Sequence, residues 1–198
     1  MPLFTHHDGS VARKIVNACY QGGIRVFEYT NRAASAAGIF KELVPYVREH
    51  MPDMAIGIGT VYNSEQAAYF AGLDCDFIIQ PVVDAGVAAV CNQHDLAWIP
   101  GAMTLTEIYT ARQLGAGIVK IFPADVVGPA FIKAIRGPMP DVRVMATGGV
   151  EPVVASLRNW FAAGAFCVGM GSQLFGAKEA AAGDAALAGL IRDCLDGI

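Results

Sequence analysis

The sequence lacks the features of several protein classes. No stretch of about 18 residues runs without a polar residue or a glycine, which argues against a membrane-spanning helix. Residues 1–8 have neither the basic start nor the apolar core of a signal peptide, so we expect a cytoplasmic protein. Basic residues form no cluster, and 14 Lys and Arg face 18 Asp and Glu, which argues against nucleic acids and anionic membranes as partners. A small molecule remains as the expected partner.

Cysteine and histidine are too scattered to predict a metal site. The five cysteines are odd in number and widely spaced, so we expect reduced thiols in the core rather than disulfides or a zinc site. His6 and His7 are adjacent and would point to opposite faces of a strand, although His6 can still line a pocket. His50 and His94 precede predicted strands, at the end of the fold opposite the expected site. We therefore predict no metal and no other cofactor.

Short apolar runs recur along the whole chain, and each is followed by turn-forming residues and a segment with helical spacing. Their separation of roughly 20 to 30 residues is the length of one strand and one helix. Eight such units predict an α/β fold, a single-domain (β/α)8 TIM barrel over residues 1–198. An open, doubly wound sheet is the alternative, but the even spacing favours closure. The eight runs are residues 3–6, 24–30, 55–60, 77–81, 97–101, 118–122, 142–147 and 166–169.

Capping residues predict where several helices begin and end. Ser10 is placed to cap a helix that Gly22 and Gly23 terminate. Residues 104–107 read Thr-Leu-Thr-Glu, which has the form of a capping box. The alanine-rich end of the chain, residues 177–198, predicts a last helix. No linker or low-complexity segment separates these elements, which favours one domain.

One lysine lies in the middle of an apolar strand. Residues 117–123 read Gly-Ile-Val-Lys-Ile-Phe-Pro, so β-branched and aromatic residues surround Lys120. Burial of an unpaired ammonium is costly, and a desolvated lysine amine is the group with which enzymes form Schiff bases. Two structural interpretations compete with this one. In the first, Lys120 pairs with Glu28 in the core; in the second, its side chain reaches out of the end of the barrel.

Polar residues late in the strands are the other candidates, because the site of such a barrel lies at the carboxyl ends of its strands. Arg32, which follows the second run, is either a carboxylate ligand or a surface group. Glu28 is either an acid/base or an ion-pair partner, and Thr60 is either a site hydroxyl or an ordinary strand residue. Alternation predicts three inward-facing sets: Val26, Glu28 and Thr30; Ile56, Ile58 and Thr60; and Ile118, Lys120 and Phe122.

Glycine-rich turns follow the last two predicted strands. They read Ala-Thr-Gly-Gly-Val over residues 146–150 and Val-Gly-Met-Gly-Ser over residues 168–172. Barrels commonly bind phosphate at this position, with backbone N–H groups. Either turn alone is a weak signal, and the two together predict a phosphate site.

Seven ordered segments resemble the class I pyruvate aldolases of the 2-keto-3-deoxy-6-phosphogluconate (KDPG) and 4-hydroxy-2-oxoglutarate (KHG) aldolase family. The resemblance covers nearly the whole chain. It is carried by GGIRVFEYTNR (22–32), GIGTV (57–61), IQP (79–81), IPG (99–101), VKIFPA (119–124), TGGV (147–150) and GS (171–172). It implies a homotrimer that acts on a small, phosphorylated 2-oxo acid. It also implies that the reaction needs no metal and no cofactor.

The resemblance also implies a role for each candidate residue. It makes Lys120 the Schiff-base lysine, Glu28 the general acid/base that acts partly through a water, and Arg32 the clamp on the substrate carboxylate. Thr60, Pro81, Phe122 and Thr147 become the residues around the pyruvyl part, and Gly148, Gly149, Gly171 and Ser172 become the phosphate cradle.

The implied reaction is cleavage of KDPG to pyruvate and glyceraldehyde 3-phosphate, with cleavage of KHG to pyruvate and glyoxylate as a second activity. Two alternatives remain open at the level of the sequence. The substrate can be the galactonate epimer, 2-keto-3-deoxy-6-phosphogalactonate (KDPGal). The chain can also be a non-catalytic phosphosugar-binding barrel in which Lys120 is only a core ion-pair partner, although the co-occurrence of Glu28, Arg32, Thr60 and Lys120 argues against it.

Overall fold

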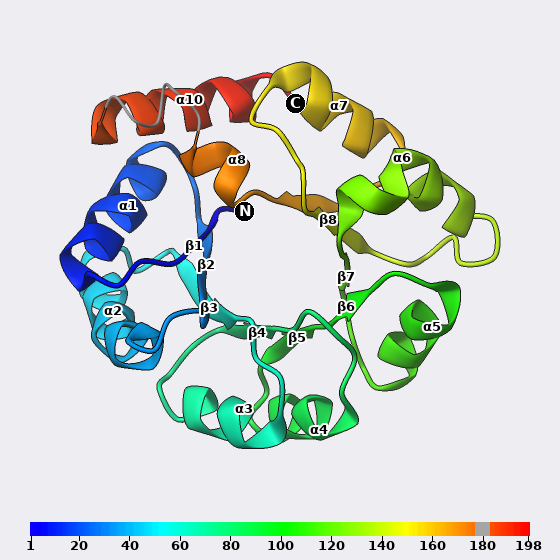
Figure 1. Cartoon of the computed structure of the whole chain (residues 1–198), viewed down its shortest axis with the longest axis horizontal. Coiled ribbons are helices and arrows are strands. Elements are labelled where there is room, and N and C mark those ends of the chain that lie inside the picture. Colours follow the sequence, from blue (N-terminus) through cyan, green and yellow to red (C-terminus); the bar gives the residue numbers. More distant parts are fainter. Residues whose placement is uncertain (177–182) are drawn as a thin grey trace.

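Strands and helices alternate along the chain and form a ring, with the strands inside and the helices outside (Figure 1). The computed structural model describes residues 1–176 and 183–198. The strands are β1 (Leu3–Phe4), β2 (Val26–Thr30), β3 (Ala55–Gly59), β4 (Phe77–Ile79), β5 (Ala97–Ile99), β6 (Gly101–Ala102), β7 (Val119–Ile121), β8 (Val144–Thr147) and β9 (Cys167–Gly169). The helices are α1 (Gly9–Gln21), α2 (Ala36–His50), α3 (Ser64–Ala71), α4 (Ala85–Gln93), α5 (Leu105–Gln113), α6 (Ala124–Ile135), α7 (Val154–Ala162), α8 (Ser172–Phe175) and α10 (Asp184–Asp196).

Parallel pairing runs around the whole ring. The order is β1-β2-β3-β4-β5 in one sheet and β6-β7-β8-β9 in the other. Pro100 separates β5 from β6, so these two short strands are one predicted strand that pairs with β4 before the proline and with β7 after it. On the other side, the N–H of Leu3 donates to the carbonyl of Met170 at 3.0 Å, which joins the end of β9 to β1. The (β/α)8 barrel is confirmed, and the open-sheet alternative is wrong.

Several element boundaries differ from the predicted ones. The first strand ends at Phe4 rather than His6, because the carbonyl of His6 accepts from the Tyr29 hydroxyl at 2.7 Å instead of a strand neighbour. Asp8, not Ser10, caps α1: its carboxylate accepts from the N–H of Ser10, which lies in the first turn.

Other helix boundaries match the prediction. The chain turns after α1 at Gly23, which has φ 102°, a conformation that glycine adopts readily. The capping box between Thr104 and Glu107 is confirmed. Of the predicted last helix, residues 177–182 lie outside the described residues, and α10 covers Asp184–Asp196.

The apolar core has two layers. The inner layer fills the barrel and is built from Phe77, Ile79, Ile99 and Met145, with Met1, Ala55, Ile118 and Cys167 packed against them. The outer layer lies between the strands and the helices and includes Phe27, Tyr29, Ile56, Ile58 and Ile78. Strand residues that face the barrel interior and strand residues that face the helices are therefore both largely buried, as in other parallel barrels.

The predicted orientation of β3 is wrong. Ile56 and Ile58 pack in the outer layer, and the inward positions of this strand are Ala55, Gly57 and Gly59. Alternation could not decide the direction because β3 is buried on both faces, so its apolar residues do not mark the interior. The interior at this point is filled instead by side chains from the neighbouring strands β2 and β4.

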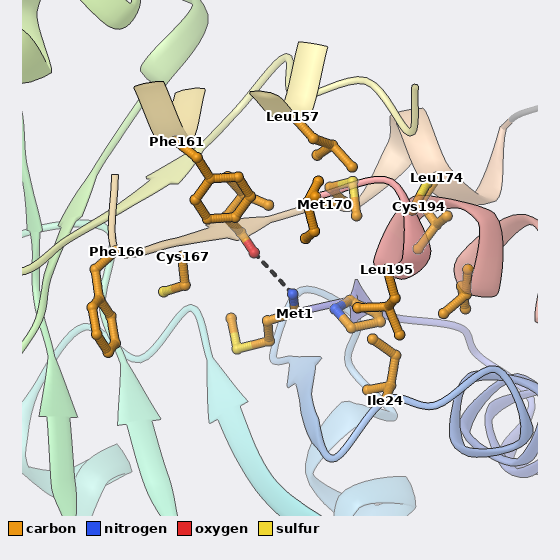
Figure 2. Close-up of a pocket in the computed structure, with 14 residues that line it drawn as sticks. Met1, Ile24, Leu157, Phe161, Phe166, Cys167, Met170, Leu174, Cys194 and Leu195 are labelled. Carbon is orange, nitrogen blue, oxygen red and sulfur yellow. Dashed lines mark hydrogen bonds between the residues drawn. The ribbon is translucent and has the colours of Figure 1, made fainter. Parts of the chain in front are cut away.

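A small apolar cavity lies near the amino-terminal side of the barrel, between β9, α7 and α10 (Figure 2). Its volume is about 120 Å³, and its walls include Leu157, Phe161, Cys167 and Cys194. The amine of Met1 donates to the carbonyl of Val168 at 2.9 Å beside it. Its lining offers almost no polar group to a ligand, so the cavity is not a candidate for catalysis.

Two further expectations can be compared with the described residues. The five cysteines form no disulfide, and burial raises the pKa of the Cys19 thiol to about 12, which fits reduced core thiols. Among residues 1–176 and 183–198, no helix combines the length and apolar character needed to cross a membrane.

Candidate active site

Lys120 lies in the barrel interior in the middle of β7. The strand is short and consists of Val119, Lys120 and Ile121, all buried, and Lys120 is only 3% exposed. Ile118 packs in the inner core layer, which places Lys120, two residues later, on the same inward face. Its Nζ lies 4.9 Å from the centre of the Phe122 ring. The amine therefore sits in an apolar and aromatic environment, as predicted from the sequence.

Burial and neighbouring charges act on this amine in opposite directions. Burial lowers the pKa of Lys120, because an ammonium loses its hydration there. The Glu28 carboxylate raises it, and the Arg32 guanidinium lowers it. Burial is the largest of the three effects, so the pKa of Lys120 lies below the ordinary lysine value. A lowered pKa leaves more of the amine unprotonated and nucleophilic.

Glu28 lies on β2, faces the barrel interior and is 1% exposed. Burial raises the pKa of its carboxyl, and Lys120 and Arg32 lower it to a smaller degree. In the part of the chain that the structure describes, no ion pair within 4.0 Å joins Glu28 to Lys120, and Glu28 Oε2 has no hydrogen-bond partner. The simple core ion pair is therefore not formed. Glu28 Oε2 is thus a buried acceptor that no group in the described residues satisfies.

Arg32 and Thr60 meet at the mouth of the barrel. Arg32 Nε donates to Thr60 Oγ1 at 3.4 Å, and the N–H of Asn31 donates to the carbonyl of Gly59 at 2.8 Å. These contacts tie the turn after β2 to the end of β3. Thr60 has φ 62°, which a β-branched residue rarely adopts. This strained backbone carries the Thr60 hydroxyl that meets Arg32.

A polar cavity of about 200 Å³ opens at the carboxyl ends of the strands. Gly148 and Gly149 have φ 105° and 67°, so the turn after β8 takes a shape that favours glycine. Thr147 Oγ1 is buried there without a hydrogen-bond partner among the described residues. Seven of the predicted site residues line this cavity: Arg32, Phe122, Thr147, Gly148, Gly149, Gly171 and Ser172.

The remaining predicted residues lie outside the cavity lining. Lys120 comes two residues before Phe122, and Glu28 comes four residues before Arg32. Both therefore lie deeper in the barrel than the cavity lining. Pro81 follows β4, and its carbonyl packs closely against Gly101. The structure therefore gives Pro81 a packing contact at the strand ends and no contact with the polar cavity.

The histidines show no sign of a metal site. The ring of His6 stacks on that of His7, with centroids 4.3 Å apart, and its Nδ1 accepts from the N–H of Asp8. His6 does not line the polar cavity. Within the described ranges, no group of three or more His, Cys, Asp or Glu side chains is placed to hold a metal ion.

Sequence reasoning missed some cavity residues. Leu3, Val150, Gly169 and Gln173 also line the cavity. Leu3 pairs in register with Glu28, which fixes it on the inward face. The only signal for Leu3 in the sequence was its place in the first apolar run. A leucine at that place is equally expected in a strand that only packs in the core. Gln173 is the residue after Ser172, and nothing in its own residue type pointed to the site.

Comparison with known proteins is decisive for the family. The model of the KDPG and KHG aldolase family matches residues 1–189. The chain belongs to this family.

Individual relatives in the KDPG and KHG aldolase family are moderately similar. The 2-dehydro-3-deoxy-6-phosphogalactonate aldolase of Escherichia coli K12 is 35% identical over 142 residues, 71% of this chain and 68% of that protein. The 2-dehydro-3-deoxy-phosphogluconate aldolase of Treponema pallidum (strain Nichols) is 32% identical over 185 residues, 93% of this chain and 85% of that one. The KDPG aldolase of Legionella pneumophila, solved with pyruvate captured as a covalent carbinolamine, has a TM-score of 0.83 and 25% identity, and the match covers 96% of this chain and 91% of that one.

Proposed function

We propose that this protein is a class I aldolase that cleaves KDPG to pyruvate and glyceraldehyde 3-phosphate, with Lys120 as the Schiff-base lysine. The observation that carries the proposal is the environment of Lys120. Its amine is buried beside Phe122, has a lowered pKa and forms no ion pair with Glu28. The amine lies below a polar cavity large enough for a small 2-oxo acid.

In the proposed mechanism, the neutral Lys120 amine attacks the C2 ketone, and loss of water gives an iminium. The iminium withdraws electrons, so the C3–C4 bond breaks as the C4 hydroxyl loses its proton and becomes the aldehyde of glyceraldehyde 3-phosphate. The electron pair of that bond stays on the pyruvyl part as an enamine. Protonation of the enamine at C3 and addition of water then release pyruvate and restore the Lys120 amine.

Glu28 is the group that we assign to the proton transfers. Its carboxylate is the acidic group whose charge acts on the pKa of Lys120. Burial raises the pKa of Glu28 itself, toward the range in which a carboxyl both accepts and returns a proton. It takes the proton of the C4 hydroxyl, directly or through a water, and returns it to the enamine. Because Glu28 makes no ion pair with Lys120, it does not hold that amine firmly as an ammonium.

Arg32 and the glycine turns hold the two anionic ends of the substrate. The planar guanidinium of Arg32, fixed by Thr60, binds the carboxylate with two parallel hydrogen bonds. Backbone N–H groups of Gly148, Gly149 and Gly171, with the Ser172 hydroxyl, bind the phosphate. In this assignment Thr60, Phe122 and Thr147 surround the pyruvyl part, and Pro81, whose carbonyl packs against Gly101, supports the strand ends beside them. Both ends are then fixed while Lys120 acts on the carbon between them.

KDPGal is the second candidate substrate, and a specific observation supports it. The Escherichia coli relative named for that epimer is 35% identical to this chain. Steady-state release of pyruvate from KDPG, KDPGal and KHG separates the alternatives, and we expect the largest kcat/KM for KDPG. A larger value for KDPGal would reassign the substrate. Binding of KDPG without pyruvate release from any of the three would instead favour a non-catalytic phosphosugar-binding barrel.

We also propose that the protein assembles as a homotrimer through the exposed apolar side chains on and next to α3, α4 and α5. Large apolar side chains that are exposed on one copy are candidates for contact with another copy of the chain. Light scattering should give three times the mass of the chain, and Tyr109→Asp should lower it, whereas Val153→Asp, on another side of the barrel, should not. A monomeric wild type would contradict the assembly. The exposed large apolar residues in this part of the chain are Tyr62, Tyr69, Val82, Met103, Leu105 and Tyr109.

A further inference from the structure

Gly59 occupies the place on β3 where a side chain would meet the Glu28 carboxylate. A Cβ added at Gly59 would overlap Oε1 of Glu28, and its next contacts are the Cδ and Cγ atoms of the same side chain. Pairing between β2 and β3 fixes this arrangement, since Glu28 pairs with Gly57 and Thr30 pairs with Gly59. The carboxylate of Glu28 therefore lies directly over the backbone of Gly59.

The backbone itself does not require glycine at this position. Gly59 is the last residue of a regular strand and is not among the glycines with positive φ in the described ranges. Glycine inside a strand is less favourable than alanine by about 0.5–1 kcal/mol. Gly59 thus has a cost in stability with no gain in backbone geometry, which points to the space that it leaves for Glu28.

We propose that Gly59 is a positioning residue for the acid/base Glu28, which it allows to lie against β3 and away from Lys120. This inference rests on the role proposed for Glu28. A methyl group at Gly59 would push the carboxylate off β3 and into the barrel interior, the side on which Lys120 lies. A carboxylate closer to Lys120 would stabilise its ammonium form and would no longer meet the C4 hydroxyl.

The test is the Gly59→Ala variant, assayed in three ways. We expect turnover of KDPG to fall by about 10²-fold, at the lower end of what loss of general acid/base catalysis costs. Exchange of the pyruvate methyl protons with deuterated water, which requires Glu28, should fall to a similar degree. The rate of borohydride trapping with pyruvate should need a higher pH to reach its maximum, because Lys120 would hold its proton more tightly.

Two control variants separate positioning from a general effect on the fold. Gly57→Ala lies in the same strand, but its Cβ meets the ring of Phe77 rather than Glu28. It should lower the thermal midpoint without moving the pH dependence of trapping. Gly38→Ala, in α2, has open space around its Cβ, so it should leave the pH dependence unchanged and raise the thermal midpoint slightly, because alanine favours a helix. Wild-type turnover and exchange in Gly59→Ala would overturn the proposal, and so would an equal shift of the pH dependence in Gly57→Ala.

A second comparison holds even if Gly59→Ala folds poorly. If the clash is with Glu28, then adding Gly59→Ala to a Glu28→Ala background should leave the thermal midpoint of that background unchanged or raise it, because alanine is the more favourable residue in a strand. An equal loss of stability in both backgrounds would overturn the proposal. Failure of the proposed function would give different results. The wild type would release no pyruvate, or Glu28→Gln would keep full turnover. The stability comparison would still test the contact between Gly59 and Glu28.

Discussion

Phe122 controls the protonation of Lys120 in two opposite ways, and two substitutions separate them. The ring lies 4.9 Å from Nζ, where a cation–π contact favours the ammonium by about 0.5–2 kcal/mol. The same ring shields the amine from water, which disfavours the ammonium. Phe122→Leu removes the ring but keeps an apolar side chain, whereas Phe122→Ala also opens the amine to water.

The two variants should therefore shift the pH dependence of imine formation in opposite directions. A loss of 0.5–2 kcal/mol corresponds to about a 2- to 30-fold increase in free amine at a pH below the pKa, so Phe122→Leu should trap pyruvate faster there. Phe122→Ala should trap it more slowly, because renewed hydration raises the pKa of Lys120. The assay is borohydride reduction at saturating pyruvate, sampled from pH 5 to about pH 10.

Phe161→Leu is the control, because Phe161 lines the separate apolar cavity and should leave the pH dependence unchanged. Equal pH dependences in the wild type and both Phe122 variants would refute the argument that the ring sets the protonation of Lys120. A shift of both variants in the same direction would refute the balance between the cation–π contact and desolvation.

Three further predictions concern the acid/base, the phosphate site and stability. Glu28→Gln should keep imine formation but lose about 10²–10⁴-fold in turnover; unchanged turnover would remove Glu28 as the acid/base. Ser172→Ala should lower kcat/KM about 10- to 100-fold for KDPG only, the loss of one hydrogen bond to a charged group, and an equal loss on KHG would contradict a phosphate contact. The lowered pKa of Lys120 means that the unfolded chain keeps this proton to higher pH, so unfolding free energy should rise as pH approaches the ordinary lysine value of about 10.4. Denaturant titrations of Lys120→Met should show a smaller rise than the wild type.

The barrel was predictable because its signals are local and repeat. Apolar runs and turn residues recur at the spacing of one strand and one helix, and the capping box at Thr104 is a short motif with a direct structural meaning. The orientation of β3 was not predictable in this way. Ile56, Gly57, Ile58 and Gly59 are all buried, so polarity does not tell which face meets the barrel interior.

The site was partly predictable, because a lysine in an apolar strand and two glycine turns are unusual enough to stand out. The distances between the side chains of the site could not be predicted from the sequence. It left open whether Glu28 and Lys120 form an ion pair, and that depends on where the Glu28 side chain lies relative to Gly59. Leu3 and Gln173 were missed because their residue types fit many places in a barrel.

The central claim is that Lys120 forms the Schiff base, and its most direct test locates the adduct. The protein is reduced with borohydride in the presence of pyruvate, digested and mapped by mass spectrometry. The account predicts one reduced pyruvyl adduct, on Lys120, and none in Lys120→Met. An adduct on another lysine, or no adduct in the wild type, would contradict it.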